Sequence, residues 1–219
     1  GSSSKLCLSC HDGTIAVGLT IAKGSIATSG TMTPADLLGT NLSPGHPVSM
    51  VPHDDGQLAP SLFGSPASTK DAAVKLAGGK IECTTCHDPH VPNNDSVVRM
   101  FLTRSNSNGA LCLACHDPSR GQPNALNGWT TGSHGTATHS VGAGAGVGAY
   151  GTVAANACSA CHGAHQNSAG ARNLKWAEES GCSPCHSGTN VTPALLNVMD
   201  EFTKTYRHPA TTVAGAHDA

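Results

Sequence analysis

The chain has few of the residues from which a protein usually builds its core. Aromatic residues make up only 3% of the 219 residues, and charged residues only 12%. A globular domain of this length normally buries more large apolar side chains, so a conventional hydrophobic core is not expected. The 26 Gly and 13 Pro residues instead favour turns and loops over long helices and strands.

Two further absences exclude classes of partner. The 12 basic residues stand against 14 acidic ones, a net charge of −2 with neutral histidines, so we expect no polybasic face for nucleic acid or anionic lipid. No run of about 18 apolar residues exists, so the sequence predicts no membrane-spanning helix. No signal peptide is recognisable, and we expect the sequence of a mature form.

What the chain does have is ten cysteines, all of them in five C-x-x-C-H motifs. A C-x-x-C pair alone also occurs in zinc sites, redox dithiols and disulfide frameworks, but none of these needs His at the next position. C-x-x-C-H is the attachment sequence for c-type haem, in which the thiols bond the porphyrin vinyl groups and the imidazole binds the iron. In chain order, the first to fifth motifs are Cys7-x-x-Cys10-His11, Cys83-x-x-Cys86-His87, Cys112-x-x-Cys115-His116, Cys158-x-x-Cys161-His162 and Cys182-x-x-Cys185-His186. We therefore predict five covalently bound haem c groups, with these ten thiols as attachment points and these five histidines as proximal iron ligands.

The motifs recur in pairs. The second and fourth motifs continue as C-x-x-C-H-x-x-H, ending at His90 and His165, and each is followed by a plain C-x-x-C-H motif. The first motif matches the second half of such a pair. We interpret residues 1–219 as one pentahaem unit, with a half unit at 1–60 and haem pairs at 80–140 and 155–219.

Composition and motifs together predict the fold class. Five flat apolar porphyrins can supply the core that the side chains lack. We therefore expect a mostly irregular chain with short α-helices, wrapped around a chain of five haems, and little β-structure. Helices are predicted over 68–77, where two glycines would end the helix, over 174–180, and over 193–206, where a proline follows a threonine cap.

Eight histidines lie outside the motifs, more than the five needed as distal ligands. Each stretch that follows a haem pair or the half unit holds two of them, and each C-x-x-C-H-x-x-H motif adds one. The four methionines show no repeated position, so we predict two histidines at every iron and hence low reduction potentials. The predicted distal ligands are His46, His90, His134, His165 and His208. The runners-up, for which hydrogen bonding to the ligand rings is the alternative role, are His53, His139 and His217.

The spacing predicts which haem each distal histidine serves. His90 lies three residues beyond His87, too close to reach the other face of the same haem, so we expect it at the haem of the third motif. By the same reasoning His165 serves the fifth motif. A continued forward order assigns His46 to the second motif and His134 to the fourth. This order leaves the first motif without a distal ligand in its own segment.

The histidines at the end of the sequence offer that ligand. His208 and His217 follow the fifth motif, and the forward order gives them no haem of their own. Either the chain folds back on itself, or one of these two histidines binds the first haem of a neighbouring molecule.

The paired motifs, with the His46–Pro47 and His208–Pro209 segments between them, resemble the doubled-CxxCH multihaem cytochromes of metal-reducing bacteria. Some members of that group polymerise into extracellular filaments, or nanowires, in which a histidine of one subunit ligates a haem of the next. The resemblance implies a head-to-tail polymer of identical subunits, outside the cell or at its surface. Its other partners would be redox cytochromes or extracellular electron acceptors.

Two classes of function compete. The first is electron transfer, either in a filament or by a discrete periplasmic or cell-surface shuttle, although shuttles of this kind are often rich in lysine. The second is a multihaem reductase, such as a pentahaem nitrite reductase. Those enzymes carry a C-x-x-C-K motif and a much longer chain, whereas all five motifs here end in His. We therefore predict electron transfer, with no catalytic residues and no enzymatic activity.

Overall fold

The computed structural model describes residues 2–15, 17–25, 32, 36–91, 93–120, 129–140, 148–165, 173–187, 197–199, 201 and 204–205. Its helices are short: α1 has nine residues, and the other helices of the described ranges have three or four. The elements are α1 (Ser3–His11), β1 (Leu19–Thr20), β2 (Gly24–Ser25), η2 (Pro60–Phe63), α2 (Cys83–Cys86), η3 (Ser107–Gly109), η4 (Cys112–Ala114), α4 (Val153–Asn156), η6 (Ala157–Ala160), α5 (Glu178–Gly181) and α6 (Ser183–His186).

The C-x-x-C-H motifs coincide with helical turns. The first lies in α1, the second in α2, the third in η4, the fourth in η6 and the fifth in α6. In the last four motifs the histidine N–H donates to the carbonyl of the first cysteine, at 2.8–2.9 Å. One helical turn therefore separates the two thiols of each motif and puts them on the same face. This is the local reason for the two-residue spacing.

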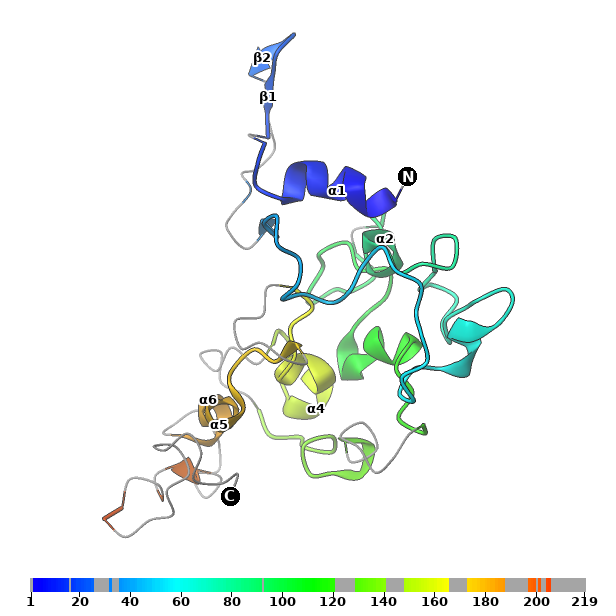
Figure 1. Ribbon diagram of the computed structural model, residues 1–219. Coiled ribbons are helices and arrows are strands. Elements are labelled where there is room, and N and C mark those ends of the chain that lie inside the picture. The colour runs from blue at the N-terminus through cyan, green and yellow to red at the C-terminus, as the bar shows by residue number, and fades with distance from the viewer. Residues whose placement is uncertain are drawn as a thin grey trace, which may run out of the picture.

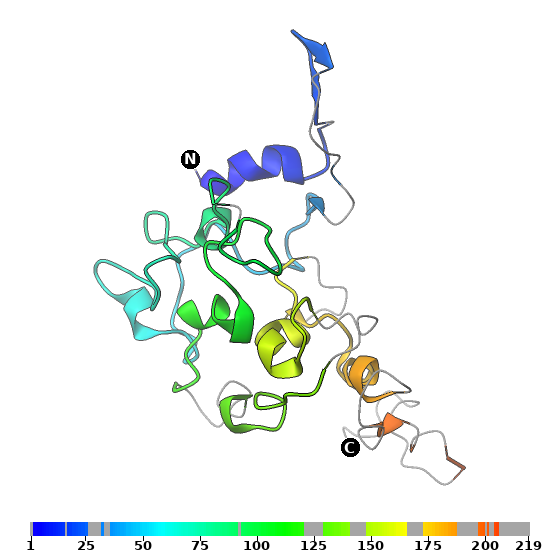
Figure 2. The same ribbon diagram turned by 180° about the vertical axis from the view of Figure 1, so that it is seen from behind.

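The elements succeed one another along the molecule. Figure 1 shows α1 and the β1–β2 hairpin at one end, α2 beside α1, α4 in the middle, and α5 with α6 at the opposite end. Figure 2 gives the same order from behind. The hairpin pairs Leu19 with Ser25 and Thr20 with Gly24. Within the described ranges no helix is long and apolar enough to cross a membrane.

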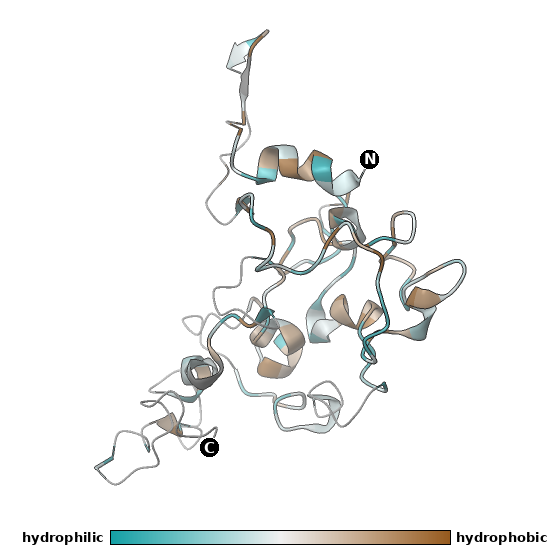
Figure 3. Ribbon diagram, in the orientation of Figure 1, coloured by the Kyte–Doolittle hydropathy of each residue, from teal (hydrophilic) through white to brown (hydrophobic). Residues whose placement is uncertain are grey.

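In the part of the chain that the structure describes, the buried apolar side chains do not form one large core. Figure 3 shows apolar residues scattered over short helices from one end of the molecule to the other. Those that are buried are mostly small, and they are Ala59, Leu62, Val74, Leu102, Ala114, Tyr150, Ala157 and Ala160. This agrees with the scarcity of aromatic residues. Wrapping around five haems stays a prediction.

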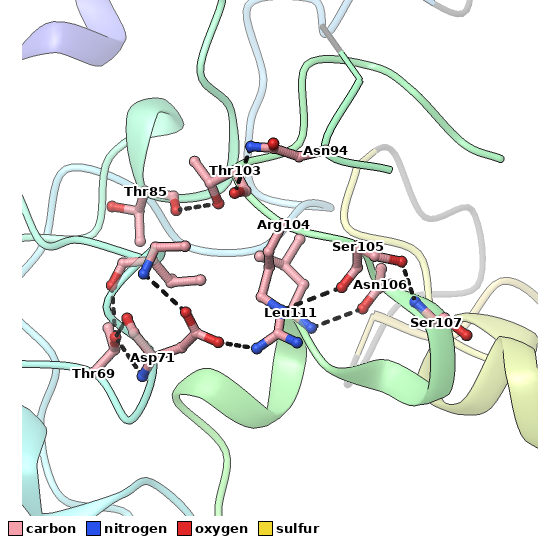
Figure 4. Close-up of polar contacts among 12 residues, drawn as sticks. Thr69, Asp71, Thr85, Asn94, Thr103, Arg104, Ser105, Asn106, Ser107 and Leu111 are labelled. Atoms are coloured by element: carbon pink, nitrogen blue, oxygen red, sulfur yellow. Dashed lines mark hydrogen bonds and ion pairs between the residues drawn. The ribbon is translucent and has the colours of Figure 1, made fainter. Parts of the chain in front are cut away.

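The predicted helix at 68–77 is wrong. Thr69 Oγ1 donates to the carbonyls of Asp71 and Val74, at 2.7 and 2.5 Å, and the Asp71 carboxylate accepts the N–H of Ala73 at 2.8 Å. Asp71 also forms an ion pair with Arg104 (Figure 4). Such side-chain bonds compete with the helical ladder. The glycines at 78 and 79 do not cap a helix but form a tight turn that closes the 77–80 bridge.

The other two predicted helices have different outcomes. At 174–180 the helix starts later than expected, because Leu174 is held in an extended bridge opposite His162 and α5 begins only at Glu178. The helix predicted at 193–206 falls largely outside the described residues.

Glu82 ties α1 to α2. Its side chain is 3% exposed, and its carboxylate accepts hydrogen bonds from the hydroxyls of Ser2 and Ser4, from the Ser4 N–H at 3.2 Å, and from Ser49 Oγ at 3.1 Å. The hydroxyl donors of Ser2 and Ser4 lower the pKa of Glu82 to about 2. Glu82 also starts α2, since its N–H donates to Thr85 Oγ1 at 3.0 Å. One carboxylate therefore positions the first two motifs.

Asp95 forms a second polar centre, between the third and fourth motifs. Its side chain is 1% exposed and accepts hydrogen bonds from the Tyr150 hydroxyl, from Ser105 Oγ at 3.1 Å, and from the N–H of Asn106 at 2.9 Å. Burial raises the pKa of Asp95, but the Tyr150 and backbone donors outweigh it and hold the pKa well below its usual range. Figure 4 shows Ser105 and Asn106 on the segment that leads to Leu111 and the third motif.

Candidate haem sites

The ten motif cysteines are available for attachment. All are free thiols, and each is at least partly accessible. The helical turn in each motif presents both sulfurs on one face, as a porphyrin with two vinyl groups requires. The structure therefore meets the first condition for covalent haem at each of the five motifs.

In most motifs the backbone of the histidine pairs with that of a leucine from another segment, which we call the crossing leucine. The antiparallel bridges that contain a motif histidine place a leucine directly opposite it; the pairs are His87–Leu102, His116–Leu58 and His162–Leu174. At the first motif, the N–H of Leu38 donates to the carbonyl of His11 at 2.6 Å. Each of these four histidines thus has its backbone fixed by a separate segment. The sequence did not reveal these leucines, because their distance from the motif varies in both size and direction.

Hydrogen bonds at Nδ1 prepare several histidines for ligation. His11 Nδ1 lies 2.8 Å from the carbonyl of Asp36, and His87 Nδ1 lies 2.8 Å from the carbonyl of Met100. In both cases the acceptor is two residues before the crossing leucine. A carbonyl acceptor fixes the proton on Nδ1 and leaves the Nε2 lone pair free for iron. His46 makes the same kind of contact, with Nδ1 3.1 Å from its neighbour's carbonyl.

Motif histidines meet histidines from outside the motifs. The described residues contain three His–His ring contacts, and the distances between ring centres are 6.0 Å for His87–His165, 6.3 Å for His116–His46 and 5.9 Å for His186–His134. A metal–nitrogen distance of about 2 Å on each side, plus the size of the rings, puts two axial imidazoles roughly 6 Å apart. Desolvation lowers the pKa of His116 and of His165, which favours the neutral ring that a metal binds. These contacts therefore suit iron with two histidine ligands.

A cleft lies where the first two motifs meet. Its lining includes Cys83 together with His46 and His165. The apolar part of its wall comes from Leu8, Leu38, Leu42 and Val48. A flat apolar group attached through Cys83 would find apolar walls there and two histidines beside it. The chemistry of these residues, a thiol, imidazoles and apolar walls, fits a haem.

The thiols of successive motifs approach one another. The Cys7 thiol interacts with that of Cys83, and the Cys112 thiol with that of Cys158. The interaction with Cys158, and then burial, raise the pKa of the Cys112 thiol far above its usual range. Burial, and then the charge of Cys115, raise the pKa of Cys86 to about 11.

The same pattern continues to the last motif. Cys161 interacts electrostatically with Cys182. These electrostatic interactions therefore join the thiols of the first motif with those of the second, the second with the third, the third with the fourth and the fourth with the fifth.

The structure does not pair every predicted ligand with a motif. In the described part of the chain, His53, His90 and His139 have no ring contact with a motif histidine. The backbone N–H of His90 donates to Asp88 at 3.0 Å. His208 and His217 lie outside the described residues.

The observed neighbours also differ from the forward order. His165 meets the second motif rather than the fifth, His46 the third rather than the second, and His134 the fifth rather than the fourth. The forward order assumed that each ligand serves the next motif along the chain. Contacts between distant segments decide these neighbours instead.

Comparison with known proteins agrees with the motif chemistry. Residues 75–121 match the family described as "Doubled CXXCH motif", a segment that contains the second and third motifs. No curated protein and no solved structure matches the chain. The family match supports a c-type cytochrome with a doubled CXXCH motif, and the motifs indicate covalently bound c-type haem.

Proposed function

We propose that this protein transfers electrons by means of five covalent haems, each with two histidine ligands, and that it is the subunit of an extracellular filament. The observation that carries electron transfer is the succession of the motifs in space. The motif helices follow one another from α1 to α6 along the molecule (Figures 1 and 2), with Glu82 joining α1 to α2 and Gly109 lying against Cys158 of the fourth motif. One-electron exchange at iron is the chemistry that a c-type haem supplies when bound.

The protein's own residues hold and orient these groups. The thiols bind, the crossing leucines fix the motif backbones, and the Nδ1 hydrogen bonds of His11 and His87 orient the rings. No substrate needs to reach the iron in this function. A reductase would need an iron with an open position, whereas eight histidines outside the motifs compete for five distal positions. Proteins with doubled CXXCH motifs are generally electron carriers, which supports a protein that is not an enzyme.

Exposed apolar side chains beside the first motif support the filament. α1 stands at one end of the molecule (Figure 1), and the side chains of Leu6 and Ile15 beside its motif are 78% and 55% exposed. Apolar side chains of this size are better covered by a protein partner than by water. A neighbouring copy could cover them and supply His208 or His217 to the first iron. The alternative is a discrete periplasmic or cell-surface shuttle, in which the distal ligand of the first iron comes from the same chain.

Two measurements test this function. Intact-protein mass spectrometry with optical and electron paramagnetic resonance spectra should show five haems, all of them low-spin. Fewer than five haems, or a stable fraction of high-spin iron, would contradict the five bis-histidine centres. Negative-stain electron microscopy of the native protein should show unbranched filaments with a regular repeat. Uniform particles of monomer size would instead support the shuttle.

A further inference from the structure

We infer that three of the five irons take their distal ligands from segments far away in the sequence: His165 for the second motif, His46 for the third, and His134 for the fifth. The inference rests on the proposed function, since it requires haem at these motifs. It assigns ligands to particular irons, and it replaces the forward order in which each ligand serves the next motif.

The ring geometry is the first argument. Ring centres about 6 Å apart also occur between ordinary aromatic side chains. Here, however, every His–His ring contact of the described residues joins one proximal histidine to one histidine from outside the motifs. No such ring contact joins two proximal histidines or two others. A selection of this kind is what two ligands on opposite sides of one iron produce.

The backbone supports two of the three assignments together. The N–H of His46 donates to the carbonyl of Ala164 at 2.8 Å, so the two segments that carry His46 and His165 cross. At the crossing a Cβ on Gly45 would lie 3.3 Å from the same carbonyl, so the approach is close even for a residue without a side chain. One backbone contact thus sets the positions of both histidines, and each faces a different proximal histidine.

The third assignment depends on the ring contact between His134 and His186. Trp129 stacks on His134, with the ring centres 6.4 Å apart and the planes at 12°. His134 in turn lies 5.9 Å from His186, with the planes at 69°. His134 thus has an aromatic neighbour in its own segment besides the proximal histidine of the fifth motif.

These three ligands would connect the half unit and the two haem pairs to one another. The segment 158–165 would hold two irons, its own through His162 and that of the second motif through His165. The segment before the first haem pair would reach the third motif through His46. The half unit and the two haem pairs are then joined by iron–histidine bonds and cannot act as separate domains.

The test removes the His165 side chain from three forms of the protein: the full chain, a chain without the second attachment site and a chain without the fifth. In the full chain, His165→Ala should convert one of five haems from low-spin to high-spin. In a chain that lacks the second attachment site (Cys83→Ala with Cys86→Ala), His165→Ala should add no high-spin haem. In a chain that lacks the fifth site (Cys182→Ala with Cys185→Ala), it should still add one. His90→Ala is the comparison variant, since it removes the other histidine of a C-x-x-C-H-x-x-H motif: because the inference gives the third iron His46, any high-spin haem that His90→Ala adds should also appear in a chain that lacks the third site (Cys112→Ala with Cys115→Ala).

The opposite pattern would overturn the inference. If His165→Ala adds a high-spin haem without the second site and none without the fifth, the forward order is right, although five bis-histidine haems remain. Where the alanine variants fail to fold, His165→Met in the same backgrounds keeps a ligand and should raise the potential of the second haem alone. A methionine variant that shifts only the fifth haem, or none, also overturns the assignment. High-spin iron in the unsubstituted protein would instead contradict the proposed function.

Discussion

The second and third motifs are held very differently from the fifth. Around the first pair, buried Glu82 and Asp95 collect hydrogen bonds, and ion pairs join Asp71 to Arg104 and Lys70 to Asp117. Around the fifth motif, the described residues provide a small apolar cluster of Ala160, Trp176 and Cys185. Within the described residues, the comparison teaches that polar contacts between distant segments place the first pair, whereas the last motif packs on a small apolar cluster.

The largest effect is expected from Asp95, because it connects the segments around the first haem pair at the point where the third motif meets the fourth. Asp95→Ala leaves the Tyr150 hydroxyl and several N–H groups without their acceptor. We expect a loss of about 3 kcal/mol in the free energy of unfolding, measured by denaturant titration of the holoprotein. Tyr150→Phe removes one donor only and should cost about 1 kcal/mol. An equal cost for both variants would show that Asp95 is not the centre of this network.

A smaller effect is expected from Gly109, where the third and fourth motifs touch. Its φ is +70°, and a Cβ there would lie 3.1 Å from Cys158 Sγ and 3.2 Å from the Ala157 side chain. Gly109→Ala should therefore cost strain plus crowding, about 2 kcal/mol in all, and should shift the spectra of the third and fourth haems. Gly79→Ala is the matched control, since its φ is +78° but nothing lies within 4 Å. Equal costs at both glycines would mean that the contact with the fourth motif is not tight.

Glu82 should make the docking of α1 sensitive to acid. Its pKa is lowered from 4.5 to about 2 in the folded chain. A lowered pKa stabilises the fold above the unfolded value, and this stabilisation is lost as the pH falls from about 4.5 towards 2. Hydrogen exchange of residues 3–11 should therefore accelerate over that range. In Glu82→Gln, exchange of α1 should be faster at neutral pH and should lack this acid step; an unchanged step would place the titrating group elsewhere.

The smallest effect is expected at Lys175, next to Trp176 of the small apolar cluster near the fifth motif. Its Nζ donates to the carbonyl of Ser159 at 2.5 Å and lies 5.8 Å from the centre of the Trp176 ring. Lys175→Met keeps the length of the side chain but removes the donor and the charge. We expect a loss of about 1 kcal/mol or less, with the spectrum of the fourth haem most affected, since Ser159 lies in the fourth motif. A loss as large as that of Asp95→Ala would remove the contrast between the two regions.

Some of the fold could be predicted from the sequence. The absence of a large apolar core followed from the aromatic content, and the short helical turns at the motifs agree with the expected short helices. The helix expected at 68–77 was wrong because Thr69 and Asp71 use their side chains to bond the nearby backbone. A propensity argument counts residue types and does not see Arg104 binding Asp71 from another segment.

The residues of the candidate sites likewise divide into those that the sequence predicts and those that it does not. The cysteines and proximal histidines are fixed by their neighbours in the chain, because attachment needs two thiols and an imidazole within one turn. The crossing leucines have no constant offset from the motifs they cross, so no spacing rule could find them. The forward order of ligands failed to anticipate the ring neighbours for the same reason, since His46 meets His116 across many intervening residues.

The sequence by itself determined which chemistry this protein carries. Ten thiols and five adjacent imidazoles make haem attachment a local matter, and local spacing is written directly in the order of residues. Only the tertiary structure decided which motifs touch and which histidines face each other. Those contacts depend on buried Glu82 and Asp95 and on backbone crossings such as that of Gly45 with Ala164. Their energy comes from pairing polar groups of distant segments away from water, which no single stretch of the chain contains.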